Sequence, residues 1–261
     1  MADLQTVSVR EGQFSVQVRS AGSGPPLVFL HGIDGLTSWP AWLEILSASH
    51  RVVAPVLPGY GESSGLENLD DFLDLTIYHQ ELFEALDVDR PTIIGHSLGG
   101  AIAAEIAAIC PGSVDKLVLV SAMGLWDDEC PVADIFATTE QDLRELSWHD
   151  LDGAVAQGLA PVAQSDEKKM AAVLDRAKSL STAGRFMWPI PDKGLSRRIH
   201  RIKAPTLLIW GDNDKIVPPV YGKLFQERIA GAKLVIVPSA GHSPMLERID
   251  VFVKAIGDFL G

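Results

Sequence analysis

Six short apolar runs, separated by segments with a helical pattern, constrain the fold of this chain most strongly. They span residues 27–30, 52–54, 92–94, 117–120, 206–210 and 234–237. Each run is almost continuously apolar, which is typical of strands buried on both faces of a sheet. Helical patterns cover residues 70–86, 98–109 and 247–259, the first with Phe72, Leu73, Ile77, Leu82, Phe83 and Leu86 at helical spacing. Strands that alternate with helices predict an α/β fold, with a mostly parallel sheet flanked by helices.

Two segments depart from this alternation of strands and helices. Residues 6–10 and 14–18 alternate at period two on either side of Glu11-Gly12, which predicts an antiparallel hairpin. Residues 124–202 contain no strand-like run, only helical stretches at 140–146 and 166–180 among scattered large apolar residues. We therefore predict a core made of residues 1–123 and 203–261, and a helical cap, residues 124–202, over one end of the sheet.

The segment Gly95-His96-Ser97-Leu98-Gly99 places a serine between a β-branched strand and an alanine-rich helix. It fits the pattern G-x-S-x-G in the strand–helix context where that pattern indicates a nucleophilic serine. A strand that turns directly into a helix holds the central residue in a strained backbone conformation, with its side chain at the apex. The glycines leave room where a Cβ would collide with backbone, and the helix N-terminus favours developing negative charge. Ser97 is therefore the predicted nucleophile.

Loops after three other strands can supply the groups that such a serine needs. The run at 27–30 precedes His31-Gly32-Ile33, and we predict that the N–H groups of Ile33 and Leu98 form an oxyanion hole. An acid follows the run at 206–210, and Gly241-His242 follows the run at 234–237. The chain order serine, acid, histidine is one of the known orders of a catalytic triad. His31 is interpreted as a structural hydrogen-bonding residue.

Seven histidines compete for the role of general base. His242 is favoured because it follows a buried strand and a glycine. His96 adjoins the serine, but neighbouring side chains point away in a sharp turn, so we interpret it as a packing residue. Apart from His31, the others lie in polar or helical settings and are expected to be exposed: His50, His79, His149 and His200.

Two aspartates, Asp212 and Asp214, compete for the role of the acid. Both follow the strand at 206–210, and Asp212 can alternatively cap the loop. The other strand end that a triad acid could occupy carries Ser121-Ala122-Met123, which offers no carboxylate.

Net charge and cysteine content limit the partners and the cellular compartment that we expect for this chain. The chain has 22 basic and 34 acidic residues, a net charge of −12, which repels phosphate backbones and anionic lipid surfaces. We therefore expect a small-molecule substrate, neither nucleic acid nor a membrane as partner, and a monomer or homodimer. An acidic N-terminus without an apolar run, and two cysteines (Cys110 and Cys130) expected as free thiols, predict a cytoplasmic protein. No metal-ligand cluster or phosphate-binding loop is apparent, so we expect no cofactor.

Together, these motifs resemble those of the α/β-hydrolase fold superfamily, in the serine-nucleophile branch whose cap follows the sixth strand. The motifs are His31-Gly32, Leu57-Pro58-Gly59-Tyr60-Gly61-Glu62-Ser63, Gly95 to Gly100, Trp210 to Pro218 and Gly241-His242. The resemblance implies an eight-stranded, mostly parallel sheet, with Ser97 as nucleophile, His242 as base and oxyanion donors at Ile33 and Leu98. The family spacing selects Asp214 as the acid. The chain departs from the pattern at Val56, where many relatives carry aspartate. This departure affects a local hydrogen bond of the loop and not the catalytic residues.

The predicted reaction is hydrolysis through an acyl-enzyme on Ser97. Serine in place of aspartate argues against haloalkane dehalogenase and epoxide hydrolase chemistry, and leaves ester, lactone and C–C bond hydrolysis and perhydrolysis. The C–C hydrolases of meta-cleavage products, which the chain partly resembles, usually carry Asn before the serine and an aromatic residue after the catalytic histidine. His96 and Ser243 stand there instead, which favours an esterase.

Large aromatic residues of the predicted cap are candidates for substrate binding: Trp126, Phe136, Trp148 and Trp188. They suggest a partly hydrophobic substrate, although each can equally belong to the core of the cap itself. A hypothesis from another class is a non-catalytic small-molecule receptor on the same fold. A receptor would be free to lose triad residues, whereas this chain keeps all of them.

Overall fold

A computed structural model describes residues 2–160, 165–190 and 192–261 of the chain. The strands are β1 (Asp3–Val9), β2 (Phe14–Ala21), β3 (Pro26–Leu30), β4 (Arg51–Pro55), β5 (Thr92–His96), β6 (Leu117–Val120), β7 (Thr206–Gly211) and β8 (Lys233–Val237). They form one eight-stranded sheet in the order β1-β2-β4-β3-β5-β6-β7-β8. β2 pairs antiparallel with β1 and β4, and the other neighbours are parallel. The predicted α/β fold, mostly parallel sheet and N-terminal hairpin are confirmed.

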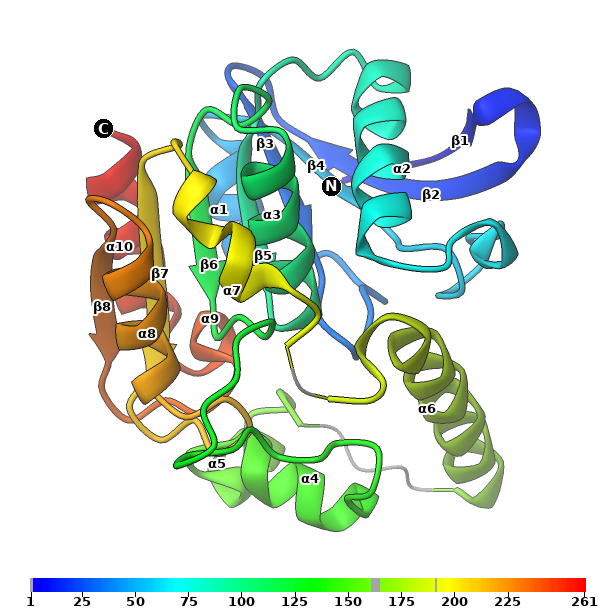
Figure 1. The fold of residues 1–261 in the computed structure, drawn as a ribbon. Coiled ribbons are helices and arrows are strands. Elements are labelled where there is room, and N and C mark those ends of the chain that lie inside the picture. Colours follow the sequence, from blue (N-terminus) through cyan, green and yellow to red (C-terminus); the bar gives the residue numbers. More distant parts are fainter. Residues whose placement is uncertain (1, 161–164, 191) are drawn as a thin grey trace.

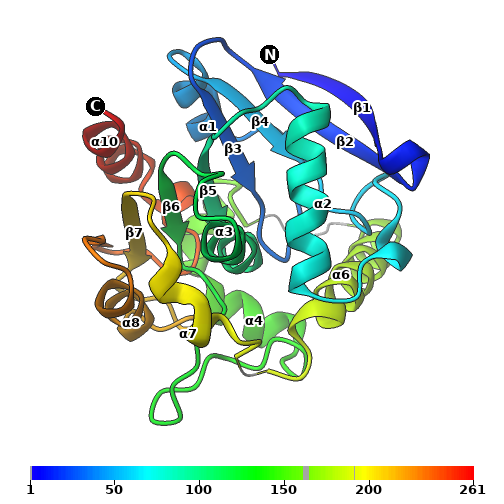
Figure 2. The same ribbon diagram turned by 45° about the horizontal axis from the view of Figure 1, so that its top comes forward.

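Helices cover both faces of this sheet (Figures 1 and 2). One face carries α2 (Phe72–Ala85), α3 (Leu98–Ile109) and α8 (Val220–Arg228). The other carries α1 (Ala41–Ser47) and α10 (Ile249–Leu260), which follows the short helix α9 (Pro244–Glu247). The sequence pattern predicted α3 to the residue and α10 to within two residues, and it did not predict α9.

The apolar runs are continuous because successive strand residues face opposite sides of the sheet and both sides are covered. Leu27 belongs to the core beneath α1 and α10, whereas its neighbour Val28 belongs to the core beneath α2 and α3. β8 differs because it is the last strand of the sheet. Ile236 is 40% exposed, so the prediction of a strand buried on both faces is wrong for β8.

The helix α2 begins with a side-chain cap, and two of the apolar residues in its predicted pattern lie outside its buried face. The Asp71 carboxylate accepts the Leu73 and Asp74 N–H groups at 2.8 and 3.0 Å. Leu73 and Ile77, which the pattern grouped with the apolar residues, are 52% and 43% exposed. The buried side instead includes His79, so the expectation that this histidine is exposed is wrong.

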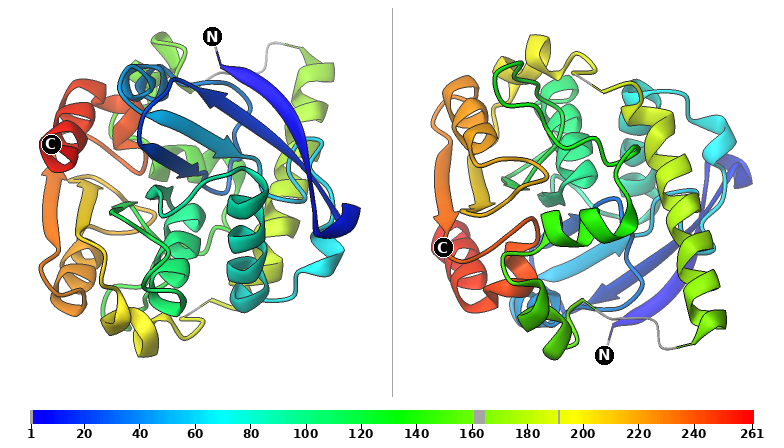
Figure 3. Two further views of the ribbon diagram at one scale, coloured as in Figure 1. Left: turned by 90° about the horizontal axis from the view of Figure 1, so that it is seen from above. Right: turned by 90° about the horizontal axis from the view of Figure 1, so that it is seen from below.

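The predicted cap, residues 124–202, lies in the chain between β6 and β7. Its described residues form α4 (Glu140–Ser147), α5 (Leu151–Ala156), α6 (Asp166–Met187) and α7 (Leu195–Arg198), and residues 161–164 and 191 lie outside the description. Figure 1 and the view from below in Figure 3 show α4 and α6 at one end of the sheet. This is the end near which β5 passes into α3.

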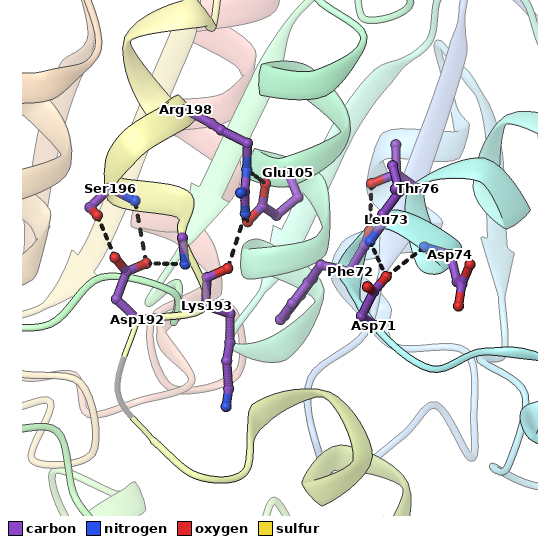
Figure 4. A network of polar contacts seen from close by, with 11 residues as sticks. Asp71, Phe72, Leu73, Asp74, Thr76, Glu105, Asp192, Lys193, Ser196 and Arg198 are labelled. Atoms are coloured by element: carbon purple, nitrogen blue, oxygen red, sulfur yellow. Dashed lines mark hydrogen bonds and ion pairs between the residues drawn. The ribbon is translucent and has the colours of Figure 1, made fainter.

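An ion pair ties the return of this segment to α3 (Figure 4). Arg198 of α7 donates through Nε to Glu105 Oε2 at 2.8 Å and through a second nitrogen to Glu105 Oε1. Glu105 is 1% exposed, and burial raises its pKa although Arg198 opposes that shift. A buried carboxylate needs such a partner, so Arg198 fixes where the chain re-enters the core.

In the described part of the chain, no helix combines the length and apolar character that crossing a membrane would require. Cys110 and Cys130 are free thiols, as the sequence predicted.

Three other histidines besides His242 are almost fully enclosed: His31, His79 and His96. His31 is held as a neutral ring, because its Nε2 accepts the Leu57 N–H at 3.0 Å and its Nδ1 faces Gly32 O at 2.7 Å. The predicted structural role of His31 is thus confirmed. Burial lowers the pKa of His31 and His79 to about 4 and that of His96 to about 3.

We expect the free energy of unfolding to fall as the pH drops from 6.5 towards 4. The unfolded chain binds protons at these histidines near pH 6.5, whereas the folded chain does not, so each contributes up to about 1.4 kcal/mol per pH unit. Urea titrations between pH 7 and 5 measure this slope. His79→Gln, which can still donate to Leu75 O, should flatten it, and the exposed His200→Gln should not. An unchanged slope in His79→Gln would contradict this origin.

Candidate active site

Ser97 occupies a strained turn between β5 and α3. Its backbone angles are φ 53° and ψ −115°, outside the conformations that a non-glycine residue prefers. Its N–H donates to Val120 O at 3.0 Å, and its carbonyl accepts the N–H groups of Ala101 and Met123, both at 3.1 Å. These bonds to β6, to α3 and to the loop after β6 hold the turn in place. The backbone angles confirm the strained conformation predicted from the motif.

Two glycines beside Ser97 are needed for close approach of backbone. A Cβ on Gly99 would lie 2.1 Å from Leu30 O, and one on Gly95 would lie 2.4 Å from Gly99 O. Real atoms do not approach so closely, so any larger residue would push α3 away from β3 and β5. The first turn of α3 therefore sits directly against the end of β3, where the predicted oxyanion loop begins.

Asp214 and His242 form a buried pair. His242 Nδ1 lies 2.9 Å from Asp214 Oδ2 and 3.1 Å from Oδ1. The Asp214 carboxylate also accepts the N–H groups of Ile216 and Val217 at 3.0 and 2.9 Å, which fix its orientation. Asp214 and His242 are only 3% and 7% exposed. The acid therefore holds one ring nitrogen of His242 and leaves the other for chemistry.

The geometry brings Asp214, and not Asp212, to the histidine. Asp212 accepts the N–H of Ala240 at 3.3 Å and the side chain of Asn213 at 3.1 Å. Those contacts link the loops after β7 and β8, which is the loop-capping role that the sequence left open for Asp212.

Among the four enclosed histidines, only His242 has a raised pKa. Burial alone would lower it, but the charge and the hydrogen bond of Asp214 outweigh burial, with smaller contributions from Asp34 and Glu247. His31, His79 and His96 stay neutral at physiological pH, so they lack the proton uptake that a general base needs there. The opposite direction of its pKa shift therefore distinguishes His242 from the other three.

Ser97 and His242 line one cavity of about 430 Å³. The core side of the cavity is formed by Ile33, Asp34, His96, Ser97, Ile216, His242 and Ser243. The opposite side comes from the predicted cap, with Ile135, Glu140, Leu143, Arg144, Ser147, Trp148, Ala172, Asp175, Arg176, Ser179 and Leu180. Within the described residues, Ser97 Oγ makes no hydrogen bond to His242. Such a bond often tightens only when substrate binds, so a shared cavity is the relevant geometry.

The N–H groups of Ile33 and Leu98 are free to act as donors. Neither donates to a backbone oxygen of another described residue. Ile33 lines the cavity beside Ser97, and Leu98 is the first residue of α3, where the helix leaves its N–H without an internal acceptor. That these two N–H groups form an oxyanion hole stays a prediction.

The four aromatic residues proposed for substrate binding fall into two groups by their position relative to the cavity. Trp148 lines the cavity, whereas Trp126, Phe136 and Trp188 do not. Phe136 stacks edge-on against Trp188 with ring centroids 5.6 Å apart, and Trp126 Nε1 donates to Asp128 Oδ1 at 2.8 Å. These three pack or bond within the inserted segment and do not line this cavity, and their role in substrate binding stays a prediction.

Several charged cavity residues escaped the sequence reasoning, among them Asp34, Arg144, Asp175 and Arg176. They stand on helices and loops with no recognisable motif. His96 also differs from expectation, because it lines the cavity and its Nε2 lies 2.8 Å from His242 O. It therefore supports the loop of His242 instead of pointing away. In the described ranges no three His, Cys, Asp or Glu side chains are arranged to hold a metal ion.

Comparison with known proteins agrees with this fold. The model of the Alpha/beta hydrolase family matches residues 27–255. The 2-hydroxy-6-oxo-2,4-heptadienoate hydrolase of Pseudomonas putida is 23% identical over 97% of this chain and 95% of its own length. Lipase 1 of Psychrobacter immobilis is 25% identical over 95% of this chain and 81% of its own length. The crystal structure of a bacterial membrane phospholipase A is alike in fold, with a TM-score of 0.83 and 24% identity over 99% of this chain and 86% of that one.

We expect the pKa of His242 to depend on Asp214 and not on Asp212. Asp214→Asn removes the negative charge beside the imidazolium and should lower that pKa, whereas Asp212→Asn should leave it unchanged. The titration of the His242 ring can be followed by NMR with isotope-labelled histidine. A lowered pKa in Asp212→Asn, or none in Asp214→Asn, would contradict the pairing.

Proposed function

The chain belongs to the alpha/beta hydrolase family, and from that premise we propose that it is a serine hydrolase which cleaves a carboxylic ester of a small, partly hydrophobic substrate. The observation that carries the proposal is the buried Asp214–His242 pair, whose ring shares one cavity with the strained Ser97. Hydrolase relatives over nearly the whole chain support the reaction class.

In the proposed reaction, Ser97 Oγ attacks the acyl carbon while the free ring nitrogen of His242 takes its proton. Asp214 stabilises the imidazolium that results. The N–H groups of Ile33 and Leu98 donate to the oxyanion, and losing one such donor typically costs about 10²–10³ in rate. The leaving alcohol takes the proton from His242. Water then gives a proton to His242 and attacks the acyl carbon. His242 returns that proton to Ser97 Oγ as the acid leaves, which restores the free enzyme.

The cavity supports an ester with an apolar acyl part. Ile135, Leu143 and Ile216 offer apolar surface beside the reacting groups, and Trp148 adds an aromatic one. The inserted segment supplies the wall opposite Ser97, and we propose that residues 124–202 form a cap that shapes the substrate site. A pocket of about 430 Å³ is within the range of small-molecule sites.

An ester is favoured over a C–C bond by the residues beside the triad. Ser243 follows His242 and lines the cavity with a small polar side chain, where C–C hydrolases of meta-cleavage products usually have an aromatic ring. His96 stands where those enzymes usually have Asn. The second candidate nevertheless keeps one specific support, because the 2-hydroxy-6-oxo-2,4-heptadienoate hydrolase is similar over 97% of this chain.

Hydrolysis of p-nitrophenyl esters from acetate to decanoate tests the nucleophile. We expect turnover with an optimum at a short or medium acyl chain, and a loss of at least about 10⁴-fold in kcat for Ser97→Ala, because the acyl-enzyme cannot form. Ser47→Ala, a half-buried serine on α1 that does not line the cavity, is the matched control and should keep full activity. Turnover that survives in Ser97→Ala would exclude Ser97 as the nucleophile.

The choice of bond is tested by giving the enzyme 2-hydroxy-6-oxo-2,4-heptadienoate alongside the best ester. We expect kcat/KM for the ester to exceed that for the diketone. The reverse order would move the assignment to C–C hydrolysis and keep Ser97 as the nucleophile. Binding of both compounds with turnover of neither would favour the receptor hypothesis.

A further inference from the structure

Glu247, at the end of α9, makes two contacts that no triad role requires. Its Oε1 accepts the Gly241 N–H at 2.7 Å, and its Oε2 accepts the His149 N–H at 2.8 Å. Gly241 precedes the proposed base His242. His149 lies in the link between α4 and α5, next to Trp148, which lines the cavity. One carboxylate thus joins two backbone segments that are 92 residues or more apart in the chain (149 to 241).

A third contact closes the same junction. The His242 N–H donates to Ser147 O at 2.8 Å. At Gly241 a Cβ would lie 2.5 Å from Ser147 O and 2.9 Å from His149 N, so the two backbones touch with no side chain between them. The histidine loop and the α4–α5 link are therefore in direct contact over Ser147–His149.

The junction fixes residues with different tasks in the site. On one side it places His242, the proposed base. On the other it places Ser147 and Trp148, which line the cavity next to the reacting groups. A shift of either backbone segment would displace the other, because their shared hydrogen bonds are short and directed.

A carboxylate suits this position better than any other side chain. It offers two acceptor oxygens to two N–H donors, whereas an amide offers one oxygen and a donor that would face another donor. Its negative charge also favours a protonated His242. The other charged or titratable groups that act on that ring are Asp214, Asp34 and His96.

We propose that Glu247 is a positioning residue that couples the proposed base His242 to the substrate wall at Ser147–His149. This inference rests on the proposed roles of Ser97 and His242. It adds that the base and the wall are set by one side chain, so a change at Glu247 affects both turnover and the fit of the acyl group.

Glu247→Gln tests the coupling, because it keeps the volume but removes the charge and one of the two acceptors. We expect kcat to fall about tenfold and KM to rise more for long acyl chains, which reach the wall, than for acetate. The acid limb of kcat/KM should move to lower pH, because losing a negative charge lowers the pKa of His242. Glu227→Gln, an exposed glutamate on α8, is the matched control.

A merely structural residue would give a different result. Glu247→Gln would then lower the melting temperature while the pH limb and the ratio of KM values between long and short esters stayed unchanged, and that outcome overturns the proposal. If Glu247→Gln does not fold, Glu247→Asp keeps the charge but is too short to reach both N–H groups. We expect this variant to have a lower kcat and an unchanged acid limb of kcat/KM. Full activity of a folded Glu247→Asp would overturn the proposal.

Failure of the proposed function can be recognised separately. If the wild type hydrolyses no ester, the His242 ring can still be titrated by NMR in the wild type and in Glu247→Gln. A lowered pKa of His242 in the variant supports the junction without any turnover, and an unchanged pKa overturns it.

Discussion

The close approach of α3 to the ends of β3 and β5 is the constraint on which the site depends. Gly99 allows it, since a Cβ there would meet Leu30 O at 2.1 Å. Because α3 starts at this point, Ser97 is forced into a left-handed backbone conformation, and the free N–H of Leu98 lies at the start of the helix, next to the loop that carries Ile33. The parallel order of the sheet then brings the loops after β7 and β8 to the same end.

The two halves of the cavity have different physical origins. The core side comes from strand ends, whose positions the hydrogen-bonded sheet fixes, and it holds the groups proposed for bond cleavage. The other side comes mainly from α4 and α6 of the inserted segment, which contacts the core at several places, among them Tyr60 with Ser179 and Asp70 with Arg185. The Glu105–Arg198 ion pair holds its return, and Glu247 holds the α4–α5 link against the loop of His242.

Sequence patterns predicted the core closely and the cavity wall poorly, for a physical reason. Ser97, His242 and the rival aspartates each follow a strand, and the carboxyl ends of parallel strands meet at one edge, so their order in the chain predicted that they lie at one end of the sheet. The choice of Asp214 over Asp212 came from the family resemblance. The inserted helices have no such register. Trp148 lines the cavity whereas Trp188 is 56% exposed, and only the packing of the segment distinguishes them. His79 was likewise misplaced, because helical spacing alone does not tell which face of α2 meets the sheet.

Covalent labelling with a fluorophosphonate tests the central claim, that Ser97 is a nucleophile activated by His242, most directly. The serine oxygen displaces fluoride and the phosphoryl group remains bound, so intact-protein mass spectrometry counts the sites and peptide mapping locates them. We predict one label per chain, on Ser97, at a rate that falls steeply in His242→Ala. Labelling of another residue, or equal labelling of Ser97 in His242→Ala, would contradict the account.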